Sequence, residues 1–560
     1  MQQLMGKAQD KEFWAYVREA DCYKSIIERL KKEYAENMAT GDLECHKYSE
    51  FKLFWTTGNR TIYEKGFNHV RSRANRAAVL ALIYPEEQEY LDTLMDSLYA
   101  ICDEYSWCLP AHHGKLEVND NARIDLTAST TAAMLSEIYT VLEDRLEPLI
   151  KNRIVYEINR RVVEPFTATD NYGWWEKGNM NWTAVCMGSV MNTIMLMRPE
   201  LATDELIARA NASMDTFLGG FEDDGMCLEG LGYWGYGFGF FMLYADMVRT
   251  FTEGKVDYFK REKVKTVATF NQKMVLTGDC SISFADGGTK YSYDIGRMHY
   301  LKNEYPDDIL VYDTKYAGSS QGKFCWLLRR VLWMDEKYLK DFADDTVERE
   351  YYAPNSQWFI KRNANYGFAA KGGHNAEPHN HNDIGTFIFA KNGRQLICDL
   401  GSGKYCRQYF GGERYTFIET RSGGHNVPII DEAEQCGGRD SRALDASYEN
   451  GVFSLDIAQA YRYEGLNSLK RTFTFTEDTV TLSDNIGYNG RGPIVERLVT
   501  RIEPKVLEGG TVEIADATVT YDATTGKCTV EEIKDSRGGT VYLISFKLKE
   551  GVKTFTCTIR

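Results

Sequence analysis

The sequence predicts a multidomain protein, α then β, with an N-terminal (α/α)n toroid followed by a C-terminal antiparallel β-sandwich. Apolar residues recur every three or four positions through the first part of the chain, and from about residue 356 the period becomes two. The length of 560 residues also exceeds what one compact core accommodates. We therefore predict a toroid over 1–345 and a sandwich over 346–560.

Amphipathic helices account for the first part. Within Asp125–Leu146, the residues Leu135, Ile138 and Leu142 lie three and four positions apart, and acidic residues lie off this stripe. The same period predicts helices over 150–162, Asn75–Tyr84, Glu87–Trp107, Thr183–Arg198, Leu201–Leu218, Gly239–Phe251 and Lys323–Met334. These are too many for a four-helix bundle. A toroid of helical hairpins is the natural packing, although periodicity alone leaves a solenoid open.

Short alternating segments make up the second part, with turn residues between them. Strands are predicted around 358–360, 366–368, 386–389, 452–455, 472–475, 480–482 and 541–544. Asn392-Gly393 and Thr525-Gly526 mark two of the turns. Many short strands at this spacing are typical of an antiparallel sandwich. The acidic segment Asp341–Glu350 is the predicted linker.

The net charge and the cysteine content limit the classes of partner and the cellular compartment that we expect. The 66 basic and 81 acidic residues give a net charge of −15, which repels nucleic acid and anionic membranes, so neither is a predicted partner. The 13 cysteines form no CxxC pair and predict buried free thiols in a reducing compartment. The start, MQQLMGKAQDKEFWAYV, has no secretory pattern. We expect a cytoplasmic protein, or a periplasmic or secreted one if the N-terminus is trimmed.

Histidines gather in one window of the predicted sandwich. His379 and His381 lie two apart, an arrangement that on a strand puts both side chains on one face. Asp399 follows a second apolar strand, and His425 lies in a Gly-Gly-His-Asn turn. The set His381, Asp399 and His425 suits Zn²⁺ rather than Ca²⁺, with water or a further residue completing the shell. The alternative is a group of hydrogen-bonded surface histidines.

The helical part carries two further polar and aromatic clusters. Asn179 and Asn181 precede a helix in EKGNMNWTAVC. The glycines of GMCLEGLGYWGYGFGFF allow close backbone packing and leave the rings of Tyr233, Trp234 and Tyr236 projecting, although core packing is the alternative. Aromatic residues make up 13% of the chain, and exposed rings suit the faces of sugars, whereas large aromatic cores are the alternative.

The segments GGHN…HNHNDIGTF, CDLGSGKY and RSGGHNVPIID resemble the signature of the heparinase II/III-like polysaccharide lyases. GNMNWTAVCMGS and EGLGYWGYG resemble that family's helical motifs, so the resemblance runs from about Trp107 to Gln435. It implies a toroid, a sandwich and β-elimination at a uronic acid. In that reaction a base removes the C5 proton, donors neutralise the carboxylate, and an acid protonates the leaving O4.

The resemblance also implies residue roles. Asn181 corresponds to the carboxylate-stabilising Asn, but Trp182 stands where the family often has His. Tyr236 corresponds to the general acid, with Tyr233 as the second candidate. His379 corresponds to the catalytic His. The resemblance also implies a base at Tyr415 and metal ligands at His381, Asp399 and His425. From the clusters themselves we expect substrate contacts at His112, His113, Asn179, Trp182, Trp234 and Arg414, although a His pair in a loop is more often solvated.

Two other function classes stay open. A glycoside hydrolase on a helical toroid would need two opposed carboxylates, and Asp223, Asp224, Glu229 and Glu176 lie near the clusters. A non-catalytic carbohydrate-binding protein with a structural zinc is the third class. The expected partners are an acidic polysaccharide or oligosaccharide and, as a homodimer, a second copy of the chain. The identity of the uronic-acid glycan stays open.

Overall fold

The structure is a computed structural model that describes residues 4–41, 47–114, 122–318 and 322–560, and it divides into two compact units. The helical unit comprises Met1–Gly220, Gly235–Lys265 and Tyr293–Phe342. The sheet unit comprises Phe221–Trp234, Thr266–Ser292 and Ala343–Arg560. The predicted boundary at 345/346 lies near the boundary at 342/343, but two earlier segments belong to the sheet unit.

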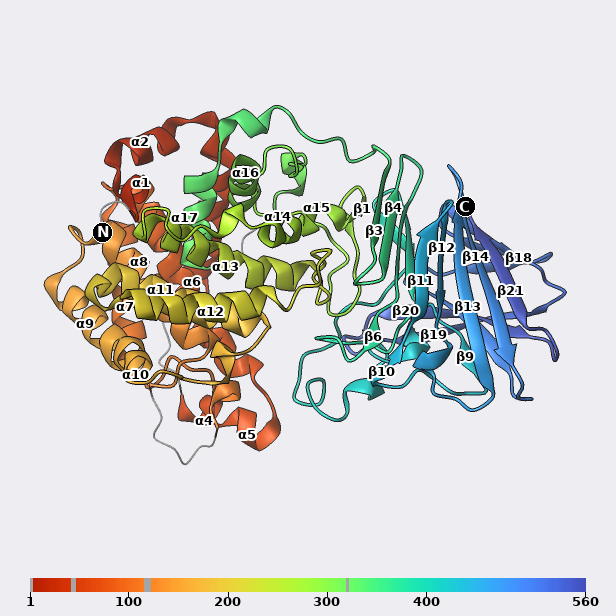
Figure 1. Ribbon diagram of the computed structural model, residues 1–560. Coiled ribbons are helices and arrows are strands. Elements are labelled where there is room, and N and C mark those ends of the chain that lie inside the picture. Colours follow the sequence, from red (N-terminus) through yellow and green to blue (C-terminus); the bar gives the residue numbers. More distant parts are fainter. Residues whose placement is uncertain (1–3, 42–46, 115–121, 319–321) are drawn as a thin grey trace. The chain divides into compact units, whose positions relative to one another are not determined.

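Antiparallel helix pairs build the helical unit (Figure 1). Helix α11 packs against α8 and α12, and α6 packs against α3, α7 and α17. The helices are α1 (Gly6–Gln9), α2 (Lys11–Glu19), α3 (Lys24–Ala39), α4 (Tyr48–Phe51), α5 (Leu53–Thr57), α6 (Thr61–Ile83), α7 (Gln88–Asp103), α8 (Leu126–Leu142), α9 (Pro148–Ile158), α10 (Glu164–Thr167), α11 (Asn181–Met197), α12 (Asp204–Leu218), α13 (Leu231–Phe251), α14 (Glu262–Ala268), α15 (Phe270–Lys273), α16 (Ile295–Glu304) and α17 (Phe324–Trp333). Helices therefore cover each segment for which the apolar period predicted one.

Helix α11 shows why the helical unit forms as it does. Nearly every side chain from Asn181 to Leu196 is buried, which is the pattern of a helix packed on all sides by other helices. Its neighbour α8 begins after Asp125, whose carboxylate accepts hydrogen bonds from the backbone N–H groups of Thr127 and Ala128. Such a cap stabilises a helix by about 1 kcal/mol.

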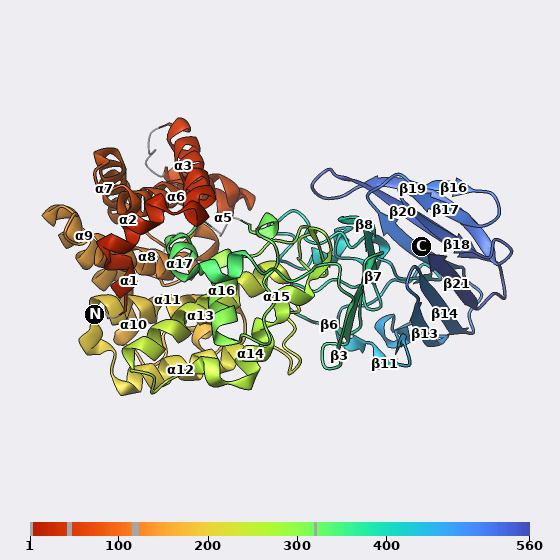
Figure 2. The ribbon, with the colours of Figure 1, turned by 90° about the horizontal axis from the view of Figure 1, so that it is seen from above.

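Antiparallel strands build the sheet unit (Figure 2). One sheet has the order β3-β4-β5-β7-β8, a second β11-β12-β13-β14-β21-β18-β17-β16, and a third β19-β20-β15-β9, with two-stranded pairs β1-β2 and β10-β6. The strands are β1 (Val275–Thr277), β2 (Cys280–Ser281), β3 (Arg349–Ala353), β4 (Trp358–Arg362), β5 (Gly367–Lys371), β6 (His374–Asn375), β7 (Phe387–Lys391), β8 (Arg394–Ile397), β9 (Ile429–Ile430), β10 (Gly438–Arg442), β11 (Leu444–Glu449), β12 (Val452–Asp456), β13 (Leu466–Phe475), β14 (Val480–Tyr488), β15 (Ile494–Thr500), β16 (Lys505–Leu507), β17 (Thr511–Ile514), β18 (Ala517–Tyr521), β19 (Gly526–Lys534), β20 (Thr540–Leu548) and β21 (Thr554–Ile559).

One aromatic core joins the three large sheets. Phe359 of β4 stacks on Phe453 of β12 at a centroid distance of 5.4 Å, and Phe368 of β5 lies 5.0 Å from Phe473 of β13. Phe546 of β20 belongs to the same buried cluster. Removing one such ring costs about 3–5 kcal/mol. The core therefore provides a rigid base for the loops that carry the polar residues described below.

Predicted turns appear where the sequence places them. Asn392 and Gly393 both have positive φ, 48° and 73°, and Lys391 pairs with Arg394 across them. This is the two-residue hairpin that an Asn-Gly pair favours.

The cysteines of the described residues are free, and most of them are buried. Among the described helices, none combines the length and the apolar character that a membrane crossing requires.

Candidate active site

The carboxylate of Asp286 is the centre of a polar cluster in the sheet unit. It lies 2.6 Å from Nδ1 of His379 and 3.2 Å from Nε2 of His381, and it accepts hydrogen bonds from the hydroxyls of Tyr405 at 3.0 Å and Tyr409 at 2.6 Å. Its side chain is fully buried. Burial acts to raise the pKa of Asp286, but the hydrogen bonds from the two histidines hold it well below its ordinary value. Asp286 is therefore a charged acceptor that orients several donors.

His379 lies between two carboxyl groups. Its Nδ1 faces Asp286, and its Nε2 lies 3.3 Å from the carboxylate of Glu229. Burial raises the pKa of Glu229. The strand predicted for His379 and His381 is wrong: both lie in the loop between β6 and β7, and His379 has a φ of +55°. In that loop Asp286 contacts both imidazole rings, and Glu229 contacts the ring of His379.

Tyr233 completes the surroundings of His379. The two rings lie 4.3 Å apart between centroids with an interplanar angle of 32°. The hydroxyls of Tyr233 and Tyr405 lie 3.1 Å apart, within hydrogen-bond distance. Burial raises the pKa values of both phenols well above their ordinary range. Both groups are therefore neutral proton donors at physiological pH.

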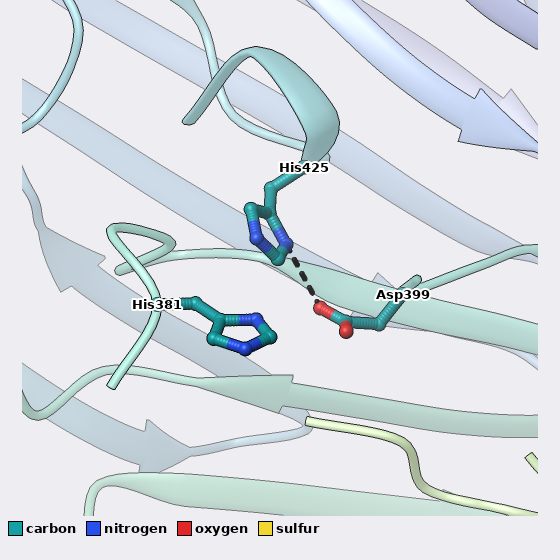
Figure 3. Close-up of side chains that lie close together, drawn as sticks. All are labelled: His381, Asp399 and His425. Atoms are coloured by element: carbon teal, nitrogen blue, oxygen red, sulfur yellow. Dashed lines mark hydrogen bonds and ion pairs between the residues drawn. The ribbon is translucent and has the colours of Figure 1, made fainter. Parts of the chain in front are cut away.

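His381, Asp399 and His425 form the donor set expected from the sequence (Figure 3). All three are fully buried, and one ligand atom from each lies within 4.8 Å of the others. Nε2 of His381 contacts Asp286, and Nε2 of His425 lies 2.8 Å from the carbonyl oxygen of Glu419. Metal-binding imidazoles have such outer partners. Both Nδ1 atoms remain for a metal, and in the described part of the chain Nδ1 of His381 has no hydrogen-bond partner.

The three residues fit a divalent cation with mixed nitrogen and oxygen ligands, and Zn²⁺ has that preference. Nδ1 of His425 lies 3.0 Å from the Asp399 carboxylate, so the two groups already face each other. The alternative of surface histidines is wrong for His381 and His425, because neither has any exposed surface.

The sandwich core positions the ligand set. Asp399 follows β8, and its neighbours Cys398 and Leu400 are buried in an apolar cluster. The side chain of Asn426, next to His425, donates to the carbonyl oxygens of Phe387 at 2.7 Å and Cys398 at 2.9 Å. The loop of His425 is thereby tied to β7 and to the residue that follows β8.

A close backbone approach brings Asp286 to the ligands. Gly401 has a φ of +64°, and a Cβ there would lie 2.3 Å from the carbonyl oxygen of Gly287. The hydroxyl of Ser283 donates to the carbonyl oxygen of Asp399 at 3.0 Å. The segment 283–287 is therefore seated on the loop after Asp399, and only a glycine permits that approach at 401.

Arg414 and Tyr415 lie beside the His379 loop. The Arg414 guanidinium donates to the carbonyl oxygens of His379 at 2.8 Å and Asn380 at 3.0 Å. It therefore holds the loop backbone, and the structure gives it that role in place of a free cation. Tyr415 is 38% exposed, and its hydroxyl accepts from the Asn380 amide at 3.3 Å.

Other predicted residues lie in the helical unit. Asn181 is the first residue of α11 and is buried, and the backbone of Gly237 approaches it so closely that a Cβ there would lie 3.1 Å from Asn181 Cβ. The Trp182 ring lies 4.8 Å from His112, which in turn contacts Asp125 at 2.6 Å. The structure thus brings His112 and Trp182 together.

Three predicted contacts differ in exposure. His113 is buried, and its Nε2 lies 3.1 Å from the hydroxyl of Ser106. Asn179 is exposed. Trp234 is 1% exposed, and its indole N–H donates to the carbonyl oxygen of Val267 at 2.9 Å. Trp234 is a core residue, so its prediction as a substrate contact is wrong. His113 likewise faces the interior.

Tyr236, the first candidate for the general acid, belongs to the helical unit, whereas Tyr233 belongs to the sheet unit. Tyr236 lies 5.5 Å from Phe240 between ring centroids and lines a cavity of that unit. Of the two tyrosines, it is Tyr233 for which the structure records a contact with His379.

Several residues of the cluster escaped the sequence analysis. Asp286, Tyr405 and Tyr409 were not predicted, and Glu229 was considered only as a hydrolase carboxylate. Asp286 follows the β1-β2 hairpin, where a single Asp before Gly-Gly resembles an ordinary turn. The sequence CDLGSGKY did carry one signal, because Tyr405 ends that motif.

The comparisons with known proteins agree with this architecture. The family model described as "Heparinase II/III-like, C-terminal" matches residues 348–532. A crystal structure of heparinase III has a TM-score of 0.60 at 14% identity, covering 88% of this chain and 76% of that chain. A mutant of the heparan sulfate lyase HepC from Pedobacter heparinus has a TM-score of 0.60 at 11% identity, covering 98% and 92%.

A chondroitinase AC lyase shares the fold more distantly, with a TM-score of 0.51 at 9% identity, covering 98% of this chain and 82% of that chain. No curated protein matches the sequence. At these identities the structural matches establish the fold, and the predicted class of a helical toroid followed by an antiparallel β-sandwich is confirmed. The resemblance stated from the motifs is also confirmed, since residues 348–532 match the family model of the heparinase II/III-like C-terminal domain.

Proposed function

We propose that the protein is a polysaccharide lyase that cleaves a uronic-acid-containing polysaccharide or oligosaccharide by β-elimination. One observation carries the proposal: His379 lies between Asp286 and Glu229 with the Tyr233 ring beside it, in a domain of the heparinase II/III-like type. This cluster offers a proton acceptor and a proton donor side by side. β-Elimination at a uronate needs one of each.

His379 is the proposed general base. Asp286 accepts the proton on Nδ1, which leaves the Nε2 lone pair to take the C5 proton of the uronate. The electrons of the C5–H bond form the C4–C5 double bond as the bond from C4 to its oxygen breaks. The carboxyl group of Glu229 lies 3.3 Å from Nε2, and since burial raises its pKa, it is a suitable next acceptor for that proton.

Tyr233 is the proposed general acid. A phenol whose pKa is raised by burial stays protonated and can donate to the departing O4. Tyr405 donates its single hydroxyl proton to Asp286, so its oxygen, 3.1 Å from the Tyr233 hydroxyl, accepts from Tyr233 before the reaction. Water returns the proton to Tyr233 after the product leaves. The resemblance favours Tyr236 for this role, but the contact of Tyr233 with His379 supports Tyr233. Tyr415 is the weaker candidate for the base, because its recorded hydroxyl contact is to Asn380.

Asn181 keeps the role that the resemblance implies, that of an amide that stabilises the uronate carboxylate. An amide N–H₂ group hydrogen-bonds a carboxylate without adding charge, which favours the enolate-like state. We assign this role from the motif and from its burial at the start of α11.

Zn²⁺ is the proposed cofactor, with His381, Asp399 and His425 as its protein ligands. When bound, it supplies a fixed cross-link between three loops of the sandwich and thereby adds to stability. His381 also contacts Asp286, so the ligand set and the catalytic His379 share one orienting carboxylate. The proposed role of the metal is therefore structural.

The acidic-glycan substrate follows from the chemistry and is supported by the fold relatives, which are named heparinase III, heparan sulfate lyase HepC and chondroitinase AC lyase. A hydrolase is disfavoured because the available carboxylates are engaged. Asp224 binds the backbone and hydroxyl of Ser356, and both oxygens of Glu176 bind Arg209. Glu229 and Asp286 flank one imidazole and do not present a free opposed pair.

The test is a panel of acidic polysaccharides and their oligomers incubated with the full chain. A lyase leaves an unsaturated uronate that absorbs in the ultraviolet, and the product mass lacks the added water of hydrolysis. We expect absorbance to rise with at least one uronic-acid glycan. Cleavage with products of hydrolytic mass and no absorbance would show a hydrolase instead. Binding without cleavage across the panel would favour the carbohydrate-binding alternative.

A further inference from the structure

A buried lysine of the sheet unit binds two carboxylates of the loop that carries His379 and His381. Lys371 is the last residue of β5 and is 2% exposed. Its Nζ donates to Oδ1 of Asp383 at 2.9 Å and lies 3.5 Å from Oε2 of Glu377. Both carboxylates are buried as well. The proposed reaction uses none of these three groups, so their function must lie in the loop itself.

The two carboxylates flank the two histidines in the sequence. Glu377 precedes His379 by two residues, and Asp383 follows His381 by two residues. A single ammonium group therefore joins the two ends of the segment that contains both imidazoles. Movement of either end would break one of its two ion pairs.

The backbone joins the same loop to β5. The N–H of Gly385 donates to the carbonyl oxygen of Lys371 at 2.8 Å, and the N–H of Lys371 donates to the carbonyl oxygen of Thr386 at 3.2 Å. The N–H of Thr386 donates in turn to the carbonyl oxygen of Asp383 at 2.9 Å. Lys371 thus anchors the end of the loop through its main chain as well as through its side chain.

The backbone conformation of His379 requires such anchoring. Its φ of +55° lies in the left-handed region, which is uncommon for a residue with a Cβ atom. Residues in that region persist where the surrounding structure over-determines them. Arg414 holds the carbonyl oxygen of His379 at 2.8 Å, and Lys371 holds a carboxylate on either side. The imidazole between Asp286 and Glu229 is thereby kept in one position.

The charges of the cluster depend on one another. Burial acts to lower the pKa of Lys371, but the negative charges of Asp383 and Glu377 raise it above its ordinary value, so the ammonium group stays charged. In the described part of the chain, Oδ2 of Asp383 has no hydrogen-bond partner. A buried ion pair of this kind adds little stability over apolar residues of the same shape, but it can specify one arrangement of the chain.

We propose that Lys371 is a positioning residue: by binding Glu377 and Asp383 together, it holds both histidines of the loop in place. His379 is then set for proton abstraction. A displacement of about 1 Å in a catalytic group can cost about 10²-fold in turnover. The catalytic part of the inference rests on the proposed lyase function, whereas the part that concerns the loop rests on the recorded contacts alone.

The experiment compares two variants of the full chain with the parent protein by hydrogen exchange and mass spectrometry. Lys371→Met leaves two buried carboxylates without their cation. The triple variant Lys371→Met/Glu377→Gln/Asp383→Asn removes all three charges, so no unpaired buried charge is left to unfold the domain. In the triple variant we expect the backbone amides of 374–386 to exchange at least about tenfold faster than in the parent, with unchanged exchange in β20.

Turnover separates positioning from a purely structural role. With a glycan that the parent cleaves, the turnover number of the triple variant should fall by about 10²-fold per folded molecule, and the Michaelis constant should change by less than about twofold. Circular dichroism gives the folded fraction. A neutral triad that supplied only stability would leave the turnover number unchanged.

A second lysine of the same sheet provides the matched control. Lys361 of β4 is also buried and donates to two carboxylates, Glu348 at 2.6 Å and Glu350, both outside the loop. The variant Lys361→Met/Glu348→Gln/Glu350→Gln should match the parent both in the exchange of 374–386 and in turnover.

The outcomes that contradict the inference are distinct from failure of the lyase proposal. Parent-like exchange of 374–386 in the Lys371 triple variant would overturn the inference, as would faster exchange with an unchanged turnover number. Hydrogen exchange needs no substrate. If the parent cleaves no glycan while the loop exchanges faster in the triple variant, the lyase proposal alone fails and Lys371 still holds the loop.

Discussion

The Asp286 carboxylate lies 2.6 Å from Nδ1 of His379, although 93 residues separate the two in the sequence. The same carboxylate reaches Nε2 of His381, whose other ring nitrogen belongs to the proposed metal set. Asp286 is therefore the link between the residue proposed for proton abstraction and the residue proposed for metal binding. Changing it should affect both metal affinity and turnover, whereas changing a carboxylate outside this cluster should affect neither.

The variant Asp286→Asn tests this link. An amide has one acceptor atom in place of two and presents an N–H₂ group that cannot accept from the histidines or tyrosines. We expect metal affinity to fall by about 10–100-fold, as is usual when an outer partner of a metal ligand is removed, and turnover to fall with it. Metal titration and the ultraviolet assay measure the two effects. Asp279→Asn, in the same hairpin segment but paired with the exposed Lys290, is the control and should retain both. Normal turnover in Asp286→Asn would contradict the proposed orientation of His379.

Tyr233→Phe removes the proposed acid and leaves the ring that contacts His379. Loss of general acid catalysis is expected to slow turnover by about 10²–10⁴-fold. Substrate binding, measured by titration with an oligosaccharide, should persist. Tyr448→Phe, which removes a hydroxyl bonded to Glu350 in the sandwich, is the matched control with unchanged turnover. The same assay on Tyr236→Phe decides between the two tyrosines: if that variant is inactive and Tyr233→Phe is active, the motif assignment holds and the acid proposed from the structure is wrong.

Removal of the metal should lower both stability and activity. The ligands His381, Asp399 and His425 come from three separate loops, so a bound ion connects segments that the unfolded chain leaves independent. We expect chelation to lower the melting temperature and the turnover, and re-addition of Zn²⁺ to restore them. The variant His425→Ala should melt at the lower temperature with or without chelator. A melting temperature and a turnover that prolonged chelation leaves unchanged would mean that the set holds no metal.

The ligand set and its neighbours show what could be predicted from the sequence. His381, Asp399 and His425 were identifiable because each lies in a motif of distinctive composition, and the structure brings their ligand atoms together. The pattern of residues around 358–389 predicted three strands of the five-stranded sheet, β4, β5 and β7, because apolar residues such as Phe359, Phe368 and Phe387 belong to the aromatic core. Motifs and strand patterns of this kind can be predicted because each lies within one short segment of the sequence.

Asp286, Glu229 and Tyr405 could not be found in that way. They converge on His379 from three segments, and two of these lie in the stretch where the sequence predicted only helices. No short motif contains them together. The positive φ of His379 was also missed, since the alternating spacing of the two histidines imitates a strand while the loop backbone does not.

Acid should destabilise the helical unit through His299. This side chain is fully buried, and its Nδ1 accepts a hydrogen bond from the backbone N–H of Asp335 at 3.0 Å, which requires the neutral ring. Burial lowers its pKa to about 4, below the value of about 6.5 in an unfolded chain. At pH values above 6.5 both states are neutral, and as the pH falls from 6.5 to 4 only the unfolded state gains the proton.

The free energy of unfolding should therefore decrease over that interval, by at most about 3 kcal/mol from this group. Denaturant unfolding at several pH values measures it. In His299→Asn, which keeps an acceptor near Asp335, the decrease between pH 6.5 and 4 should be smaller than in the parent. His69→Asn, at a partly exposed histidine of α6, serves as the control and should retain most of the parent's slope. Identical slopes in the parent and in His299→Asn would rule out this origin of acid sensitivity.

Asn181 tests the part of the mechanism that rests on the helical motif. If its amide stabilises the charge that develops on the uronate carboxylate, the interaction is strongest in the enolate-like state and its loss lowers turnover more than binding. Removing one such donor costs about 10²–10³-fold in turnover. Asn181→Ala should show that loss in the ultraviolet assay, and Asn181→Asp should be worse, since a carboxylate repels the uronate. Asn152→Ala, at an exposed position of α9, should retain full turnover. A higher Michaelis constant with unchanged turnover in Asn181→Ala would mean that the amide stabilises the bound substrate and the transition state equally. Asn181 would then be a substrate-binding residue without a catalytic role.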